Sequence, residues 1–258
     1  MTSFKNTLLL ASAFAAAVSG APVEQASAVS TKRGLAYNQV TALNPFAKKP
    51  CFSWSYNWGS AAGGDIQGTE YVPMNWGEKM FGEWDNLAEA ALASGSKHLL
   101  AFNEPDLAEQ ANMSPEAAAA AYQQYMNPYG DRARLGSPAI TNGAAPYGLD
   151  WMKKFFDACA GNCKIDFLAI HWYDGAEHAF WFKKHITECI EFAKAHGIDK
   201  IWVTEFQGMG DDVSQVKFMN EVLPWLDSND SVERYAYFMV DTLLRGKSVS
   251  SVGQRYSS

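Results

Sequence analysis

The sequence predicts an α/β protein built as one (β/α)8 TIM barrel. Short apolar runs rich in β-branched and aromatic residues alternate with longer segments of helical periodicity, and eight such runs are present. Eight strands with intervening helices in about 230 residues is the number expected of this fold. No composition shift, low-complexity linker or repeat divides this part of the sequence, so residues 32–258 are predicted to form a single domain.

The first 21 residues have the three-part layout of a secretory signal peptide. A lysine lies near the start, an apolar run extends from Leu8 to Val18, and the small residues Ser19, Gly20 and Ala21 follow. The run is too short to cross about 30 Å of hydrocarbon as a helix, so a membrane anchor is not expected. Residues 22–31 are interpreted as a short leader. We therefore expect a secreted monomer, extracellular or in the cell wall.

Each predicted strand is a short β-rich run, and the helices between them carry start and stop signals. Ser114 followed by Pro115 is typical of a helix N-terminus, whereas Gly95 and Gly197 each follow the end of a helical pattern. The predicted strands are residues 34–38, 51–57, 70–75, 97–103, 134–141, 166–172, 200–204 and 235–239. The predicted helices are residues 81–94, 115–126, 147–160, 179–196 and 215–226.

The first two connections, residues 39–50 and 58–69, look too short or irregular for full helices. A doubly wound open sheet is the alternative architecture. That fold usually carries a glycine-rich phosphate loop after its first strand, and the segment Gly34-Leu35-Ala36-Tyr37-Asn38 is not one. The barrel is therefore preferred.

Composition excludes some classes of function. The formal net charge is −7 and Lys and Arg do not cluster, which argues against a nucleic-acid partner. Nine Trp and eleven Tyr suit a sugar-binding cleft, although aromatic residues also fill ordinary cores. The five His are scattered and no Asp series has the spacing of an oxygen-ligand loop. We expect no cofactor and no metal.

Four cysteines, Cys51, Cys159, Cys163 and Cys189, allow three disulfide connectivities. The close spacing of Cys159 and Cys163 around Gly-Asn suggests a local disulfide at a helix-to-strand turn. Asn112 and Asn229 begin glycosylation sequons. Asn229 is preferred, because its polar surroundings suggest an exposed loop and because Pro115 follows the Asn112 sequon.

Two glutamates come directly after apolar strands, Glu104 after the fourth and Glu205 after the seventh. In a barrel of this type, catalytic side chains lie at the C-terminal ends of the strands. Strands four and seven lie roughly across the barrel mouth from each other, so both carboxylates can point into one cleft. Glycoside hydrolysis needs such a pair, one protonated toward the leaving oxygen and one ionised toward the sugar carbon. The sequence predicts Glu104 as acid/base and Glu205 as nucleophile.

Polar and aromatic residues at the other strand ends are candidate substrate-binding residues. Asn103 can hydrogen-bond a sugar hydroxyl, and Pro105 stiffens the chain beside Glu104. Tyr173 can donate a hydrogen bond to the nucleophile. Trp58, Tyr173 and Tyr237 are the preferred sugar platforms, whereas Trp54, Trp76, Trp172 and Phe206 are interpreted as packing residues. The full predicted substrate-binding set is Asn103, His171, Tyr173, Tyr37, Asn57, Trp58 and Tyr237.

Six segments, KRGLAYN, SWSYNW, FNEPD, DFLAIHWY, IWVTEF and YAYF, occur in an order that resembles glycoside hydrolase family 128. The resemblance extends from Lys32 to about Tyr256. It implies a (β/α)8 barrel, a fungal-type secreted β-1,3-glucanase with an alkali-sensitive-linkage-like catalytic domain, and cleavage with net retention. By position it also implies Glu104 as acid/base and Glu205 as nucleophile. Tyr237 departs from the Trp expected there, which affects the expected sugar subsite.

The function expected from these observations is retaining, endo-type hydrolysis of β-1,3-glucan by double displacement, with β-glucan as the partner. The β-1,3 linkage depends on the resemblance alone. One alternative is a non-catalytic cell-wall protein that binds glucan, although such a protein would typically have lost one carboxylate. Another is a hydrolase of the same clan that acts on β-1,6-glucan or mannan.

Overall fold

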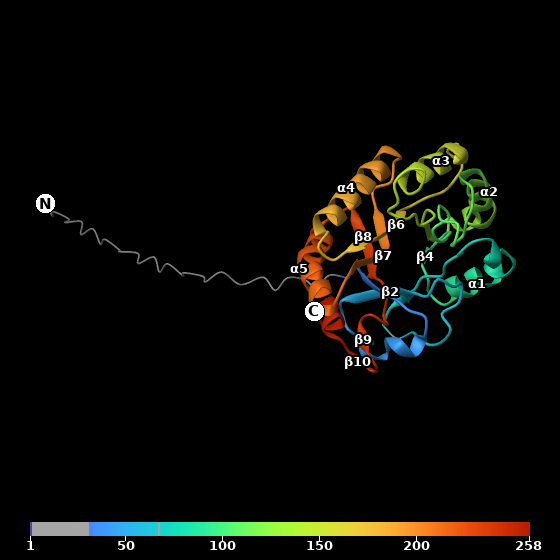
Figure 1. The fold of residues 1–258 in the computed structure, drawn as a ribbon. Helices are drawn as coiled ribbons and strands as arrows, with labels where there is room; N and C mark the ends of the chain where they lie inside the picture. The colour runs from blue at the N-terminus through green and yellow to red at the C-terminus, as the bar shows by residue number, and fades with distance from the viewer. Residues whose placement is uncertain (2–30, 67) are drawn as a thin grey trace.

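A computed structural model describes Met1, residues 31–66 and residues 68–258. The predicted signal peptide and most of the predicted leader lie outside the described residues and remain predictions. Residues 32–258 contain eight parallel strands and form one α/β structure, as the sequence predicts. Helices α1 to α5 follow one another around the outside of the strands (Figure 1).

The strands form two parallel sheets that are joined at both junctions by isolated bridges. The larger sheet has the order β3-β2-β1-β8-β7-β6, and the smaller pairs β4 with β5. Bridges between Met74 and Leu100 and between Gly136 and Phe167 connect β3 to β4 and β5 to β6. The strands are β1 (Arg33–Ala36), β2 (Phe52–Tyr56), β3 (Glu70–Tyr71), β4 (His98–Leu99), β5 (Arg134–Leu135), β6 (Leu168–Gly175), β7 (Ile201–Met209) and β8 (Val232–Tyr237).

Three of these strands are shorter than the sequence predicts. β3, β4 and β5 have two residues each, and beyond them the chain continues through isolated bridges such as Asn103 with Ala139. Pro73 and Pro138 lie in these stretches and have no amide N–H to donate to a neighbouring strand. β7 is instead longer than predicted, so Glu205 lies within it.

The outer layer contains α1 (Phe81–Ala93), α2 (Pro115–Tyr125), α3 (Leu149–Cys159), α4 (Ala179–Ala195), α5 (Asp212–Ser228) and the short α6 (Ser251–Tyr256). The Ser114 hydroxyl accepts a hydrogen bond from Ala117 N and caps α2, as predicted. The connection after β1 is a 3-10 helix, η1 (Val40–Phe46), and no helix occurs in the described residues between β2 and β3. A short antiparallel hairpin of β9 (Leu244–Arg245) and β10 (Ser248–Val249) precedes α6.

Side-chain alternation divides the core into two parts. Ala36, Trp54, Trp202 and Ala236 point to the inside of the ring, where they pack with Phe167 and other buried side chains. The residues between them on the same strands face the helices and belong to the larger, outer cluster. Because adjacent residues on a strand point to opposite faces, one residue in two reaches the inside of the ring.

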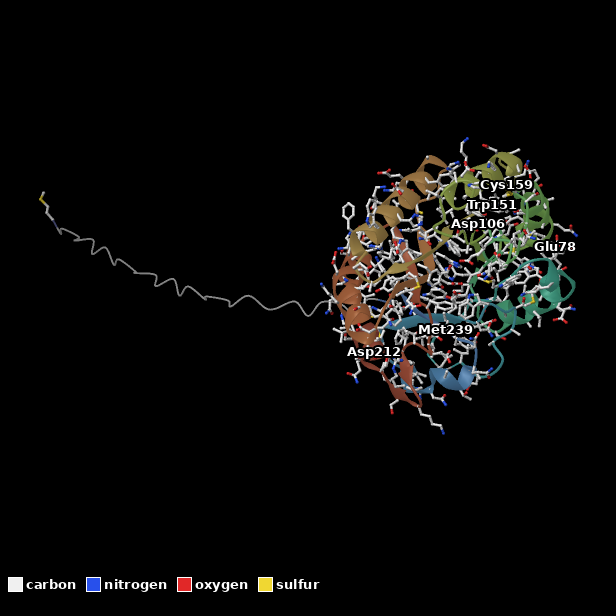
Figure 2. The ribbon with its side chains drawn as sticks, viewed as in Figure 1. Glu78, Asp106, Trp151, Cys159, Asp212 and Met239 are labelled. Atoms are coloured by element: carbon white, nitrogen blue, oxygen red, sulfur yellow. A yellow bond between two sulfur atoms is a disulfide. The ribbon has the colours of Figure 1, made fainter. Side chains whose placement is uncertain are left out.

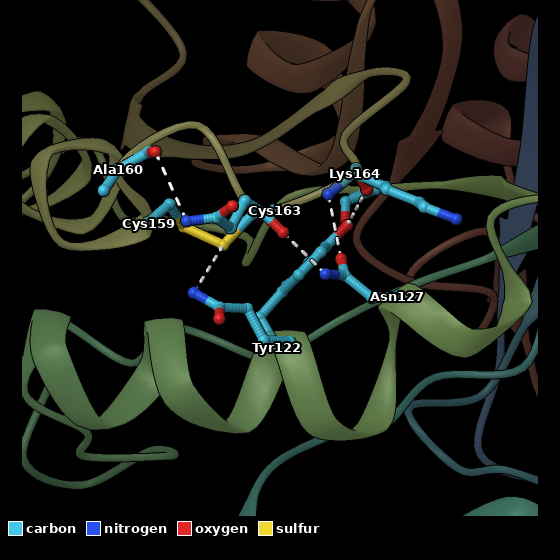
Figure 3. The surroundings of a disulfide bond; sticks show 9 residues. Tyr122, Asn127, Cys159, Ala160, Cys163 and Lys164 are labelled. Carbon is cyan, nitrogen blue, oxygen red and sulfur yellow. Dashed lines mark hydrogen bonds between the residues drawn. A yellow bond between two sulfur atoms is a disulfide. The ribbon is translucent and has the colours of Figure 1, made fainter.

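The predicted Cys159–Cys163 disulfide is present, whereas Cys51 and Cys189 are buried free thiols. The disulfide closes the turn after α3, and this turn is attached to α2 and the segment after it (Figure 3). The Tyr122 hydroxyl donates to Lys164 O at 2.9 Å, and Asn127 Nδ2 donates to Asn162 O at 2.6 Å. The disulfide therefore lies in a segment that also has hydrogen bonds to a neighbouring helix.

The two sequon asparagines differ in exposure. Asn112 is exposed, whereas Asn229 is half-buried at the end of α5 and its Oδ1 accepts a hydrogen bond from Ser231 N. Asn112 is thus the more accessible of the two, contrary to the order expected from sequence. Separately, none of the helices in the described part of the chain combines the length and hydropathy that crossing a bilayer requires.

Candidate active site

A cleft of about 550 Å³ lies at the C-terminal ends of the strands. Each of the eight strands, or the segment directly after it, contributes at least one lining residue. Side chains fill the interior of the ring, and Asp106 and Met239 mark the segments that follow β4 and β8 (Figure 2). The lining residues are Asn38, Trp58, Trp76, Asn103, Glu104, Leu107, Gln110, Thr141, Asn142, Tyr173, Glu205, Phe238 and Met239.

Glu104 is held at the cleft by its own backbone. Its N–H donates to Ala139 O at 2.7 Å, and its carbonyl accepts from Leu107 N at 3.0 Å. Its φ of 44° lies in the left-handed region, which costs a non-glycine residue free energy and is enriched at functional sites. The side chain is almost fully buried, and Oε1 lies 2.8 Å from His171 Nδ1.

Glu205 is brought into the cleft by a bulge in β7. Ile170 pairs with Val203, but the next pair along β6 is His171 with Glu205, so Thr204 is an extra residue on β7. A bulge of this kind re-aims the side chains that follow it. As a result, Glu205 faces His171 and the cleft, whereas Phe206 packs in the outer core.

Two side chains donate hydrogen bonds to the Glu205 carboxylate. Trp58 Nε1 donates to Oε1 at 2.6 Å, and the Tyr173 hydroxyl donates to Oε2. Burial, and then the negative charge of Glu205, hold the pKa of Tyr173 far above its usual value, so its proton stays in place as a donor. An indole N–H can only donate. Both contacts therefore use the Glu205 oxygens as acceptors and hold the carboxylate in one orientation.

His171 connects the two glutamates from beneath the cleft. The ring is fully buried, with Nδ1 on Glu104 and Nε2 3.0 Å from Thr204 Oγ1 and 3.4 Å from Glu205 Oε1. Burial alone lowers the pKa of this histidine, but the charge of Glu205 and the hydrogen bond with Glu104 outweigh it and raise the pKa above the usual value. His171 contacts the carboxylates and does not line the cleft, in contrast to its predicted contact with substrate.

The two carboxylates are close to each other. One oxygen of Glu104, one oxygen of Glu205 and one ring nitrogen of His171 lie within 4.8 Å of one another. These three groups are also the donor set that a metal ion would use in the described residues. Glu104 Oε1, His171 Nδ1 and both Glu205 oxygens already have hydrogen-bond partners within the protein, Trp58 and Tyr173 among them, so a cation bound through these atoms would have to displace those contacts.

Asn103 lines the cleft with an amide that is only partly satisfied. Its Nδ2 donates to Gln110 Oε1 at 3.2 Å, whereas the buried Oδ1 has no partner in the described structure. A buried acceptor without a donor is costly unless a ligand or water supplies one. In this geometry Asn103 Oδ1 can accept a hydrogen bond from a sugar hydroxyl, which suits the predicted role of Asn103.

Besides His171, three further predicted substrate-binding residues do not line the cleft. Tyr37 and Tyr237 are buried in the outer core, and the Tyr237 hydroxyl donates to Gln215 Oε1 at 2.8 Å. Asn57 instead stabilises the turn that follows it, because its Nδ2 donates a hydrogen bond to Ala61 O at 2.9 Å. The expected placement of these three side chains is wrong. Tyr237 in β8 and Tyr37 directly after β1 belong to the outer core, and Asn57 is used within its own turn.

Several cleft residues were not predicted from the sequence. Trp76 lines the cleft although it was interpreted as packing, and Phe238 occupies the place expected for Tyr237. The signal for Phe238 was strand alternation, since Ala236 faces the inside of the ring and Phe238 is two residues further along. Trp76, Gln110 and Asn142 lie on irregular segments, whose side-chain directions no periodic pattern indicates.

Known proteins of this architecture match nearly the whole chain. Residues 34–256 match the family described as glycosyl hydrolase catalytic core. Alkali-sensitive linkage protein 1 of Schizosaccharomyces pombe is 37% identical over 233 residues, which are 84% of this chain but 40% of that protein. The chain thus spans less than half the length of this curated relative.

Two solved structures match this chain over nearly the whole of their own length. A curdlan-specific exo-β-1,3-glucanase of family GH128 (subgroup III) from Blastomyces gilchristii, in complex with glucose, is 59% identical, with a TM-score of 0.87 over 88% of this chain and 97% of that one. A GH128 (subgroup I) endo-β-1,3-glucanase from Amycolatopsis mediterranei, with laminaritriose, is 30% identical, with a TM-score of 0.73 over 88% and 98%. The chain is therefore a member of glycoside hydrolase family 128, as the sequence motifs indicate.

Proposed function

We propose that this protein hydrolyses β-1,3-glucan with net retention, with Glu205 as nucleophile and Glu104 as acid/base. The observation that carries the proposal is the approach of the two carboxylates to within 4.8 Å in one cleft. Retaining glycosidases hold their carboxyl groups about 5–5.5 Å apart, whereas inverting enzymes leave about 6.5–9.5 Å for a water molecule. The short separation supports double displacement.

The hydrogen bonds support the two roles. Glu205 accepts hydrogen bonds from Trp58 and Tyr173, which hold its carboxylate in position to attack the anomeric carbon. Among the described residues, the Glu104 carboxyl group has one hydrogen bond, between Oε1 and His171 Nδ1, which leaves its other oxygen for a proton directed into the cleft. The backbone hydrogen bonds of Glu104 with Ala139 and Leu107 also hold this residue in position during the reaction.

In the first step, Glu205 forms a bond to the anomeric carbon as the glycosidic C–O bond breaks, and Glu104 gives its proton to the leaving oxygen. In the second step, Glu104 takes a proton from a water molecule, whose oxygen attacks the same carbon and releases Glu205. The two inversions give net retention. Asn103, through its free Oδ1, accepts a hydrogen bond from a sugar hydroxyl.

The proposed mode of action is exo cleavage, which differs from the endo mode expected from sequence. The support is the 59% identity with a relative described as a curdlan-specific exo enzyme, against 30% with one described as an endo enzyme. Secretion is also proposed, on the signal-peptide pattern of residues 1–21.

The test is product formation from curdlan, laminarin, β-1,6-glucan and mannan by the full protein and by Glu205→Gln and Glu104→Gln. We expect release from the β-1,3-glucans alone, glucose as the first product, and β-anomers seen first by NMR. Glu205→Gln should lower kcat by at least about 10⁴-fold. Glu116→Gln, an exposed glutamate on α2, is the matched control and should keep wild-type activity.

Initial α-anomers would contradict retention, and unchanged turnover by Glu205→Gln would remove its role as nucleophile. Release of long oligosaccharides first would contradict the exo mode. No release from any of the four polymers would favour the alternative of a glucan-binding protein.

A further inference from the structure

A second cleft, of about 480 Å³, lies next to the catalytic one. It is bounded by the segment between β5 and α3, by β6 and by the first turns of α4. Asn142 lines both clefts, and its side chain is fixed by hydrogen bonds of 3.2 Å to the backbone N and O of Tyr173. The two cavities therefore meet at one well-held side chain.

Aromatic rings are exposed at this second cleft. Trp181 lines it with 54% of its surface exposed, and the Phe180 ring, 67% exposed, packs edge-on against Trp181 at 5.3 Å. Tyr147, also largely exposed, lies on the segment that forms the opposite side. Trp181 thus lines the cleft, and the Phe180 ring packs beside it. Large exposed apolar side chains at a hollow indicate a surface used for binding.

The lining also contains polar residues and carries both signs of charge. Asp174 and Glu188 are exposed acids, and Lys184 lies between Glu188 and the Trp181 ring. An anionic ligand would meet two carboxylates there, and a purely apolar ligand would leave them without water. A neutral polyhydroxylated chain fits better, since its C–H faces can stack on Trp181 and its hydroxyls can bond to the acids.

Because the two clefts are continuous, their arrangement indicates which part of the glucan chain would lie in the second cleft. The segment that carries Asn142 is bound to the Glu104 segment, because Thr141 Oγ1 donates to Asp106 Oδ2 at 2.6 Å. Glu104 protonates the leaving oxygen in the proposed mechanism, so the sugars on its side belong to the leaving portion. An exo enzyme has nearly all of its polymer on that side.

We infer that the cleft beside α4 binds glucosyl units of the leaving portion of a β-1,3-glucan chain, with Trp181 as the stacking platform. This inference depends on the proposed function for the identity of the polymer. The second cleft would be a binding region about as large as the catalytic cleft. Activity on long chains would then depend on Trp181, which does not contact the bond that is cleaved.

The experiment compares wild-type protein with Trp181→Ala and with the conservative Trp181→Phe. Substrates are laminaribiose, which is too short to reach the second cleft, laminarihexaose and curdlan. Trp181→Ala should lower kcat/KM about 3- to 10-fold on the long substrates and leave it unchanged on laminaribiose. Trp181→Phe should restore most of the loss. Val213→Ala, an exposed apolar residue on α5, is the control.

Binding without turnover separates this inference from the proposed function. Glu205→Gln protein, with and without Trp181→Ala, is titrated with laminarihexaose by calorimetry. If Glu205→Gln binds the hexaose and Trp181→Ala changes neither affinity nor long-chain activity, the second cleft is not a glucan site. An equal loss on laminaribiose also overturns the inference. If the protein neither binds nor cleaves any β-1,3-glucan, the proposed function fails as well.

Discussion

Tyr173 and Trp58 reach the same carboxylate from β6 and from the segment after β2. The Tyr173 ring packs edge-on against Phe238 at 5.4 Å, and the Trp58 ring contacts both Tyr56 and Phe238. Aromatic packing thus fixes both donors before a substrate arrives, and little ordering of these groups is needed during the reaction.

At the residue scale, we predict that Tyr173→Phe lowers kcat about 10- to 100-fold while the protein remains folded. The ring contacts are kept, but Glu205 loses a hydrogen bond to a charged group, a bond that contributes about 1.5–3 kcal/mol. The measurement is steady-state kinetics with thermal unfolding in parallel. Tyr125→Phe is the same chemical change on α2, away from the cleft, and should be neutral. Wild-type kcat in Tyr173→Phe would contradict this role.

At the scale of the element, the side chain of one aspartate connects the segment after β4 to the segment after β5. Asp106 Oδ2 accepts hydrogen bonds from Thr141 Oγ1 at 2.6 Å and from Gly148 N at 2.8 Å, and Thr141 N lies 3.2 Å away. These contacts tie the Glu104 segment to the connection between β5 and α3. The acid/base and the border between the two clefts are therefore positioned together.

Asp106→Ala should destabilise the protein by about 1–3 kcal/mol, because the buried donors of Thr141 and Gly148 lose their acceptor. We expect kcat/KM to fall as well, since Glu104 is two residues away. Urea unfolding and kinetics measure the two effects. Asp157→Ala removes an exposed ion pair with Lys153 at 3.9 Å and should change stability by less than about 1 kcal/mol. Equal stability of the two variants would show that the Asp106 hydrogen bonds do not stabilise the fold.

At the scale of the molecule, the end of the ring away from the cleft contains a cluster of partly buried charged residues. Glu70 accepts hydrogen bonds from His98 Nδ1 at 2.9 Å and from Arg234 at 2.7 Å. Burial alone raises the pKa of Glu70, but the His98 hydrogen bond and the Arg234 charge outweigh it and lower the pKa to about 2. The ionised form of Glu70 is thus stabilised by folding.

A carboxylate with a lowered pKa contributes stability that is complete above its unfolded pKa of about 4.3 and is lost as the pH falls toward 2. Glu70→Gln should therefore be less stable than wild type by on the order of 3 kcal/mol at pH 7. The difference should shrink between pH 4 and pH 3. Urea unfolding at pH 7, 4 and 3 measures it, with Glu116→Gln as control. A difference independent of pH would contradict the assignment.

The sequence predicted the fold class and the two glutamates because both depend on short-range patterns. Alternating strand and helix runs indicate the barrel, and the position of Glu104 and Glu205 after apolar runs places them at the strand ends. The family was confirmed by the comparisons. The Cys159–Cys163 disulfide also followed from local spacing.

The directions of other side chains were not predictable in the same way. The extra residue Thr204 breaks the alternation of β7, and a bulge is visible only when the neighbouring strand is known. Tyr237 was expected at the cleft although its strand position turns it toward the helices. Asn142 and Trp76 lie on segments without periodicity, so their place in the clefts depends on the tertiary fold.

The pairing of β1 with β8 has a consequence for the order of synthesis. Arg33 and Tyr235 are partners in this pair and are 202 positions apart in the chain. At a translation rate of about 5–20 residues per second, β1 leaves the ribosome roughly 10–40 s before its partner exists. During that interval one edge of β1 has no strand to pair with. The nascent chain must therefore keep this edge from associating with other chains, and a chaperone that binds the segment near residue 33 would act in that interval.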